Sequence, residues 1–220
     1  MKQKVIILIS IVLLPAALTG YAQNNTVINA FPYIESFEGA YSSFWKIYDI
    51  DNDGNCWKNN SGSVYIKTGE HSIQHGAALT AQDGWLVSPE ISIPANENLS
   101  FSVWMKNQFS YPDCTNRILI STGSNNPVTN RSDFVEKWSS AAATAEIWEE
   151  IVISLSQYKG MNIYIAFQYQ TPGKGGHGWF MDDVSIISLH DYDAGVSAIT
   201  QPVEGAGLGN SETVTVKVKN

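Results

Sequence analysis

Apolar and polar residues alternate along several stretches of the chain, and this alternation limits the possible fold more than any other feature. In two stretches every second residue is apolar or aromatic: Leu99, Phe101, Val103 and Met105, and then Ile163, Ile165, Phe167 and Tyr169. A period of two places such residues on one side of a β-strand. The pattern predicts antiparallel sheets, each with one face buried against a common core.

Shorter stretches extend the same pattern. Further strands are expected at Arg117–Ser121, Trp148–Leu155 and Trp179–Ile187, and a weaker one at Tyr33–Glu38. Turn-forming Gly, Pro and Asn residues separate the runs. The sequence therefore predicts an all-β fold, with one sandwich domain over residues 33–189.

A second unit is expected after residue 189. Strands are predicted at Val196–Ile199 and Glu212–Val218, with a Gly-rich turn between them. Two strands in about 30 residues cannot bury a core of their own. We therefore expect residues 190–220 to be a linker and the start of an incomplete second domain.

The N-terminus has the order of a secretory signal peptide. Lys2 and Lys4 precede an apolar run from Val5 to Leu18, and small residues at positions 20 and 22 suit cleavage after Ala22. A membrane anchor is the alternative, but this run is shorter than the roughly 20 residues that a spanning helix needs. The sequence predicts a signal peptide at residues 1–22, a polar leader at 23–32, and a secreted or cell-surface product without a membrane span.

Charge makes nucleic acid an unsuitable partner. The formal net charge of −8 becomes −10 when residues 1–22 are removed, because that segment holds two lysines and no acid. Such a surface repels phosphate backbones and attracts divalent cations.

The motifs of the common catalytic sites are missing. The chain has no Gly-x-Ser-x-Gly elbow, no phosphate-binding loop and no Cys-x-x-Cys pair. His71 and His75 have the spacing of a zinc-binding helix, but the sequence around them is typical of a loop. In an oxidising compartment Cys56 and Cys114 are expected to form a disulfide, with two unpaired thiols as the alternative.

Acidic residues form two candidate metal-binding segments. Asp49, Asp51 and Asp53 alternate and are followed by Gly54, which suits a tight loop that directs hard oxygen ligands at Ca²⁺. Asn60 replaces the final glutamate of an EF-hand loop, so the site is not an EF-hand; a solvated acidic turn is the alternative. Asp182 shares the parity of Phe180, Val184 and Ile186, which would place it toward the core. A buried carboxylate there needs a cation or several N–H donors.

Four aromatic residues are candidates for ligand contact. Trp104 is predicted to face away from the core side of its strand, and Phe109, Tyr111 and Trp179 lie beside loops. Such rings could stack on a sugar, although most tryptophans in a sandwich belong to the core.

Several separated motifs resemble the cleaved-adhesin family, also called choice-of-anchor J, over roughly residues 33–189. In chain order they are Ser36–Gly39 (SFEG), Trp45, Asp49–Gly54 (DIDNDG), Trp57, Asp83–Pro89 (DGWLVSP), Ile118–Gly123 (ILISTG), Asp133–Phe134, Trp148, Leu155–Gly160 (LSQYKG), Ile163–Phe167 (IYIAF) and Asp182–Ile186 (DDVSI). Asp193–Val196 and Gly209–Val214 resemble the start of an Ig-like repeat.

The resemblance implies a jelly-roll sandwich of the galactose-binding and MAM type, as in gingipain-like adhesins of Bacteroidetes. It also implies structural Ca²⁺ and pairs an N-terminal glutamate, here Glu38, with an acid of the final strand. We expect Glu38, the Asp49/Asp51/Asp53 loop and Asp182 to converge on this ion. Asp183 replaces Asp182 if the strand begins with a bulge.

The function expected from these features is a non-enzymatic adhesin or haemagglutinin-like module. Its partner would be a host surface or extracellular protein or glycan. The alternatives are a spacer or accessory domain of a larger secreted peptidase, or a glycoside hydrolase, which would need two acids facing one cleft.

Overall fold

The computed structural model describes two parts of the chain. Side chains are described for residues 27–39, 44–109, 111, 113–140, 146–173 and 175–189, and the backbone alone for 195–201 and 215–219. The predicted signal peptide lies outside these residues. Among the described residues, no helix is long and apolar enough to cross a membrane.

The first layer of the sandwich is a seven-stranded sheet. Its strands are β1 (Val27–Ile28), β3 (Lys46–Asp49), β6 (Gln82–Val87), β7 (Glu90–Ser92), β9 (Thr115–Ser121), β10 (Phe134–Ser140) and β12 (Asn162–Thr171). β12 is central, because it pairs with β9 along one edge and with β6 and β7 along the other. β10 continues the sheet beyond β9, and β3 continues it beyond β6.

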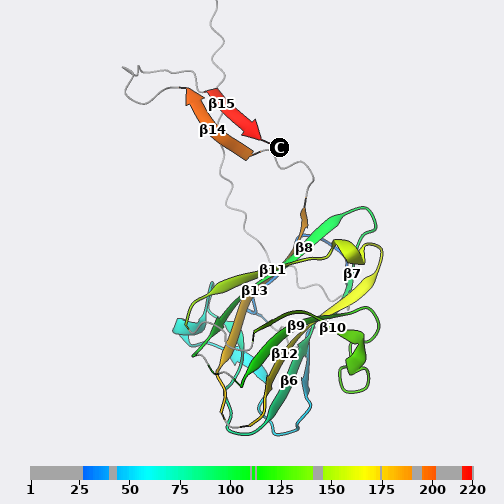
Figure 1. Cartoon of the computed structure of the whole chain (residues 1–220), viewed down its shortest axis with the longest axis vertical. Helices are drawn as coiled ribbons and strands as arrows, with labels where there is room; N and C mark the ends of the chain where they lie inside the picture. The colour runs from blue at the N-terminus through cyan, green and yellow to red at the C-terminus, as the bar shows by residue number, and fades with distance from the viewer. Residues whose placement is uncertain are drawn as a thin grey trace, which may run out of the picture.

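The second layer is a six-stranded sheet centred on β13. Its strands are β2 (Tyr33–Glu35), β4 (Trp57–Asn60), β5 (Ser72–His75), β8 (Asn98–Asn107), β11 (Glu149–Ser154) and β13 (Trp179–Leu189). Figure 1 shows β8, β11 and β13 in one layer and β6, β9, β10 and β12 in the other. Among the described residues, three short 3₁₀ helices lie in connections: η2 (Ser63–Tyr65), η3 (Arg131–Asp133) and η4 (Ser156–Tyr158).

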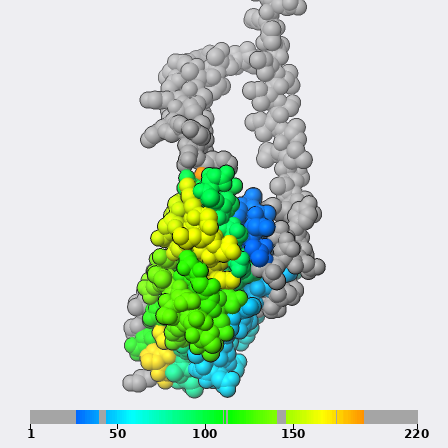
Figure 2. Space-filling model, turned by 90° about the vertical axis from the view of Figure 1, so that its right-hand side faces the viewer, coloured from blue at the N-terminus to red at the C-terminus, as the bar shows by residue number. Residues whose placement is uncertain are grey.

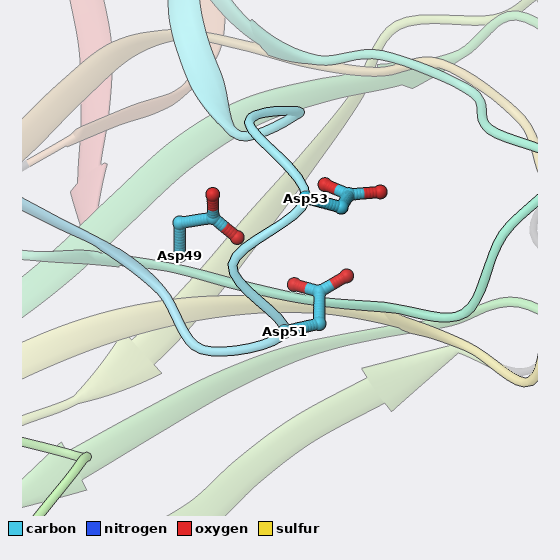
Figure 3. A group of neighbouring side chains, drawn as sticks. All are labelled: Asp49, Asp51 and Asp53. Carbon is cyan, nitrogen blue, oxygen red and sulfur yellow. The ribbon is translucent and has the colours of Figure 1, made fainter.

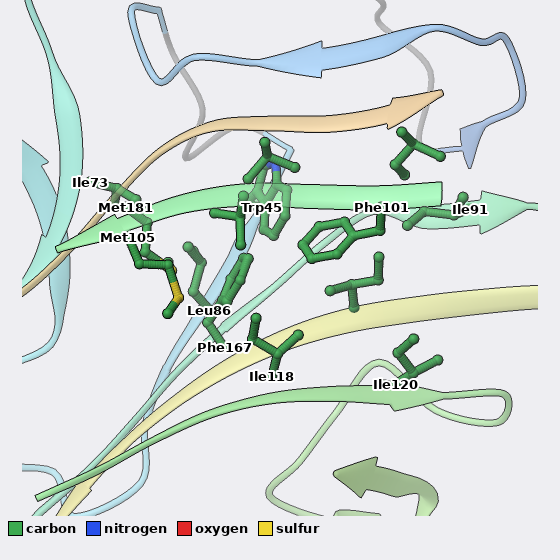
Figure 4. Packing of buried hydrophobic residues seen from close by; sticks show 14 of the residues in the cluster. Trp45, Ile73, Leu86, Ile91, Phe101, Met105, Ile118, Ile120, Phe167 and Met181 are labelled. Atoms are coloured by element: carbon green, nitrogen blue, oxygen red, sulfur yellow. The ribbon is translucent and has the colours of Figure 1, made fainter. Parts of the chain in front are cut away.

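The core between the layers contains the alternating residues of the two clearest predicted strands, at 99–105 and 163–169. All eight of these residues are buried in one cluster, together with Trp45, Trp57, Trp179 and Leu86. Figure 4 shows part of this cluster, with Phe101 from β8 and Phe167 from β12 filling the space between the sheets. The two sheets with this shared core confirm the predicted jelly-roll β-sandwich. Packing the two alternating faces against each other removes their apolar side chains from water and stabilises the fold.

A second, smaller cluster lies on the outer face of the seven-stranded sheet. Its members are Trp85, Val87, Leu119, Phe134 and Ala166. The connection between β9 and β10, residues 122–133, packs over it: the Tyr48 hydroxyl donates to the Asn125 carbonyl at 2.8 Å, and the Arg131 guanidinium lies 5.3 Å from the centre of the Trp85 ring. Part of this outer face is therefore covered.

The leader differs from the prediction. Val27 and Ile28 form β1, which pairs in parallel with Glu90 and Ile91 of β7, and Ile28 is buried. The sandwich therefore begins within the segment expected to be a polar leader. Polar residues surround Ile28 in the sequence, and they hid the strand. Burial of the Ile28 side chain beside Ile91 removes apolar surface from water and favours the pairing of β1 with β7.

Both strands predicted after residue 189 are present where the structure describes them; residues 212–214 of the second prediction lie outside the described residues. β14 (Gly195–Gln201) pairs antiparallel with β15 (Thr215–Lys219). The proposal that they open an Ig-like domain stays a prediction.

A β-bulge in β13 overturns the predicted orientation of Asp182. Asp183 has a left-handed backbone with φ 48°, and the pairing with β8 shifts between Asp182 and Ser185. Before the bulge, Phe180 and Asp182 pair with Lys106 and Trp104 on the outer face. After it, Val184 and Ile186 face the core, so the parity that grouped Asp182 with them does not hold across residue 183.

Candidate functional site

Asp182 lies under a strap rather than in the core. This strap, residues 61–71, connects β4 to β5 and crosses the outer face of the six-stranded sheet. The Asp182 side chain is fully buried, and one of its oxygens accepts the N–H groups of Lys67 and Thr68 at 2.9 and 3.2 Å. Burial raises the pKa of this carboxyl to about 6 despite these donors.

Glu38 and Asp183 also hold the strap. Glu38 accepts the N–H groups of Glu70 and His71 at 2.9–3.0 Å, and Asp183 accepts the Thr68 hydroxyl at 2.7 Å. Burial alone would raise the pKa of Glu38, but the donors on His71 and Glu70 outweigh it and lower that pKa. These three acids therefore satisfy N–H and O–H donors of the strap, which was the alternative to metal binding for the acids of the final strand.

The acidic loop after β3 forms a separate cluster. Ligand oxygens of Asp49, Asp51 and Asp53 all lie within 4.8 Å of one another, and Figure 3 shows the three carboxylates gathered around one turn of the chain. In the described residues this is the one group of three or more acids, histidines or cysteines so closely spaced. The prediction that Glu38, this loop and Asp182 converge on one ion is therefore wrong, because they occupy two places.

Internal hydrogen bonds shape the acidic loop. Asp49 accepts the N–H groups of Asn52 and Gly54 at 3.0 and 2.9 Å, and both donors have left-handed backbones. Asp53 accepts the Asn55 N–H and side-chain donors on Thr80 and Gln82, which lowers its pKa.

Asp51 differs from its two neighbours in the loop. Burial, and then the neighbouring carboxylates Asp49 and Asp53, raise its pKa. The crowding of negative charge and the spacing of the oxygens fit a hard cation, because oxygens bound at 2.3–2.6 Å to Ca²⁺ lie within about 5 Å of each other. The residues of this loop are thus suited to hold Ca²⁺.

The four predicted aromatic contacts have different surroundings. Trp179 is fully buried and packs 5.2 Å from Trp57, centre to centre, so its predicted role in stacking on a ligand is wrong. Trp104 is half-buried on the outer face of β8, with the Lys67 ammonium 3.9 Å from its ring centre. Phe109 is exposed, and Tyr111 is half-buried with its hydroxyl end against Gly175.

Both cysteines are free thiols, so the expected disulfide is absent. The Cys114 thiol is buried and donates to the Tyr169 hydroxyl at 3.0 Å. The Cys56 thiol lies 3.5 Å from the Tyr48 carbonyl, and burial raises its pKa to about 11. Each sulfur thus has its own polar partner.

A row of polar side chains crosses four strands on the outer face of the seven-stranded sheet. We call it the polar ladder; its members are Asp83 of β6, Gln168 and Gln170 of β12, Arg117 of β9 and Glu136 of β10. Gln168 donates to Asp83 at 2.8 Å. Arg117 donates to Gln168 at 3.3 Å, to Gln170 at 2.8 Å and to Glu136 at 3.1 Å.

An open hollow of about 400 Å³ adjoins the polar ladder and shares Asp83 and Gln170 with it. Its lining residues are Asp51, Ala81, Gln82, Asp83, Asp113, Thr115, Gln170, Thr171 and Pro172. They come from the starts of β6 and β9, the end of β12 and the acidic loop. Figure 2 shows the molecule turned by 90° from the view of Figure 1. The green atoms of residues near 115–140 occupy the middle of the surface that faces the viewer.

Sequence reasoning did not single out the polar ladder. Its residues occupy ordinary outward positions of amphipathic strands, where polar side chains are expected. The one available signal was the pair Gln168 and Gln170, two planar amides at alternate positions opposite the core-facing Phe167 and Tyr169. Their contact with Arg117 depends on strand register, which a single sequence does not specify.

Comparison with known proteins identifies the family. A sequence model described as the Cleaved Adhesin Domain matches residues 30–186. Hemagglutinin A of Porphyromonas gingivalis is 24% identical over 174 residues; the match covers 67% of this chain and 6% of that relative. The chain therefore corresponds to a small part of Hemagglutinin A.

Solved structures share the fold. The K1 cleaved adhesin domain of Lys-gingipain from Porphyromonas gingivalis W83 is 20% identical, with a TM-score of 0.56 over 73% of this chain and 100% of that domain. The K3 cleaved adhesin domain of the same protein is 21% identical, with a TM-score of 0.51 over 71% and 98%. These structures share the fold of the chain, and the match of the family model over residues 30–186 shows that the chain belongs to the Cleaved Adhesin Domain family.

Proposed function

We propose that the chain is an exported, non-catalytic binding module that recognises a protein or glycan of a host surface. The observation that carries the proposal is the polar ladder. Its side chains are fixed by hydrogen bonds to one another, yet Glu136 and Arg117 keep 47% and 24% of their side-chain surface exposed. Ordered polar groups on an accessible sheet face lose little conformational entropy when they bind a partner.

The names of related proteins agree with this role. Hemagglutinin A and the cleaved adhesin domains of Lys-gingipain are both named for adhesion. A spacer domain of a larger peptidase would need no ordered polar face, and a glycoside hydrolase would need two carboxyl groups placed across one cleft.

A screen of the full chain against immobilised extracellular-matrix proteins and a glycan array tests the proposal, with product analysis for each bound glycan. We expect saturable binding and no cleaved product. Hydrolysis would replace the proposal with an enzyme, and the absence of binding by correctly folded protein would favour a spacer.

We also propose that Asp49, Asp51 and Asp53 hold a Ca²⁺ ion that stabilises the domain. The support is their oxygen spacing and the raised pKa of Asp51. A bound cation would neutralise the crowded charge of the loop. The loop is already attached to β6, because the N–H group of Asp83 donates to Asp51 at 3.3 Å.

A further inference from the structure

The hydrogen bonds within the polar ladder leave some of its donor groups without an acceptor. Among the contacts of the described residues, the Gln170 amide nitrogen and the second terminal nitrogen of Arg117 donate to no protein acceptor, while the Gln170 oxygen is occupied by Arg117. Asp113 and Thr115 beside them line the hollow without a side-chain hydrogen bond to the described residues. The site thus offers donors and acceptors side by side, fixed in direction.

Charges of the polar ladder are paired internally. Arg117 neutralises Glu136, and Arg131 forms a close ion pair with Asp83. The hollow itself contributes the further carboxylate of Asp113, unpaired among the described residues, and no basic side chain, while Asp51 at its edge belongs to the proposed Ca²⁺ site. An anionic ligand would therefore be repelled, whereas hydroxyl groups can donate to carboxylates and accept from the Gln170 amide and the Arg117 guanidinium.

Size and shape also favour a hydroxyl-rich ligand. The hollow is comparable to the lower end of ligand-binding clefts, which measure about 300–1,000 Å³. Its lining contains no aromatic or large aliphatic side chain among the described residues, so an apolar anchor from a protein partner would find little to contact. The ladder continues from the hollow across β12, β9 and β10, which provides a path for a chain of several units.

We propose that the polar ladder and the hollow bind a neutral oligosaccharide, with one sugar unit in the hollow and the next units across β12 and β9. This inference rests on the proposed binding function and names its ligand class. Recognition depends on hydrogen bonds to Gln170, Arg117 and Asp113 rather than on stacking. Asp83 also accepts the indole N–H of Trp85 at 2.8 Å, so occupation of the hollow is expected to change Trp85 fluorescence.

The test uses the full chain and three classes of probe: neutral gluco-, galacto-, xylo- and manno-oligosaccharides, oligogalacturonates, and lysine-rich peptides. We expect at least one neutral series to bind with a fluorescence change, and the oligogalacturonates to bind at least tenfold more weakly. Gln170→Ala is expected to weaken binding of the neutral sugar about tenfold. Gln157→Ala, an exposed glutamine in η4, is the matched control and should leave it unchanged.

Asp113→Asn supplies a second, independent variant, because Asp113 is exposed and its replacement should not disturb folding. Its expected effect is also a loss of affinity for the neutral sugar. Neutral-sugar binding that neither variant weakens would overturn the assignment to this face. A preference for the lysine-rich peptide or the oligogalacturonate would overturn the ligand class.

Binding to extracellular-matrix proteins separates the ligand class from the proposed binding function. If the chain binds an extracellular-matrix protein saturably but binds no neutral oligosaccharide, the binding module stands and the sugar assignment is wrong. If it binds neither, both are wrong.

Discussion

His75 and His177 lie inside the sandwich as neutral imidazoles, because burial lowers the pKa of each ring to about 4. His75 stacks on Tyr169 with ring centres 4.2 Å apart, and His177 has one ring nitrogen within 3.1 Å of the Asn116 amide. The structure gives no hydrogen-bond partner for His75 Nε2 or His177 Nδ1 among the described residues. Protonating either ring would therefore place a positive charge in a buried environment, with no acceptor for the added N–H group among the described residues.

Acid should destabilise the domain through these residues. The unfolded chain protonates each histidine near pH 6.5, whereas the folded chain does so only near pH 4, so stability falls as the pH drops through this window. The variant His177→Asn removes one of the two contributions. Between pH 7 and pH 4.5 the wild-type free energy of unfolding should fall by about 2 kcal/mol more than that of the variant.

Urea unfolding at the two pH values provides the measurement. The comparison is made between slopes, because other groups such as Asp182 titrate in both proteins and the lost Asn116 contact is a constant offset. Equal pH dependence of the two proteins would show that His177 is not a buried neutral group.

At the scale of elements, the bulge in β13 decides where the acids of the final strand lie. Asp183 adopts φ 48°, a conformation that glycine accepts freely and that β-branched residues strongly disfavour. Asp183→Gly loses the hydrogen bond from Thr68 but relieves the backbone. Asp183→Val loses the same bond and adds strain of roughly 1–2 kcal/mol.

Comparing these two variants isolates the backbone term. We expect the Val variant to be less stable than the Gly variant by at least about 1 kcal/mol in chemical unfolding. Equal stability of the two would mean that residue 183 is not left-handed, and the assignment of Asp182 to the outer face would lose its basis.

Strand positions could be predicted from the sequence, whereas their contacts could not. Alternation at 99–105 and 163–169 identified β8 and β12 and their core faces, because burial of one face leaves a direct trace in residue types. The prediction that Asp182 faces the core was wrong because a bulge inserts one residue into β13, which shifts the alternation and has no distinctive sequence signal. The predictions of ligand stacking by Trp179 and of a disulfide between the two cysteines were wrong for another reason. Whether a ring is covered, or two thiols meet, depends on which distant segments pack together.

The candidate site likewise has a part that the sequence predicts and a part that depends on contacts between distant strands. The acidic loop was recognisable because its three acids are close in sequence. The polar ladder joins Asp83 to Glu136 across four strands, and only the register of β6, β12, β9 and β10 brings these residues into one row. The strap contacts of Glu38 and Asp182 likewise depend on a connection that crosses the sheet.

At the scale of the whole molecule, calcium should act as a stabilising ligand. An ion that binds only the folded state raises stability with its free concentration. At a hundredfold excess over its dissociation constant, Ca²⁺ should raise the melting temperature by roughly 5–10 °C for a domain of this size, and a chelator should reverse the change.

Asp51→Asn should remove most of this calcium-dependent shift, because it deletes one of the three carboxylates whose oxygens lie within 4.8 Å of one another. Burial, and then the neighbouring Asp49 and Asp53, raise the pKa of Asp51, and a bound cation would relieve this crowding. Glu150→Gln, on the exposed outer side of β11, is the control for a general effect of lost negative charge. A melting temperature that responds to neither Ca²⁺ nor chelator would show that the acidic loop holds no stabilising Ca²⁺ ion.

We propose that this cleaved-adhesin domain binds a ligand and catalyses no reaction on it. The most direct measurement incubates the full chain with the glycan or matrix protein that it retains best, records the equilibrium binding curve, and analyses the recovered ligand by mass spectrometry. We expect a saturable curve and a ligand of unchanged mass after prolonged incubation. A ligand cleaved in proportion to the amount of chain, or no saturable binding by folded protein, would contradict the proposed non-catalytic binding.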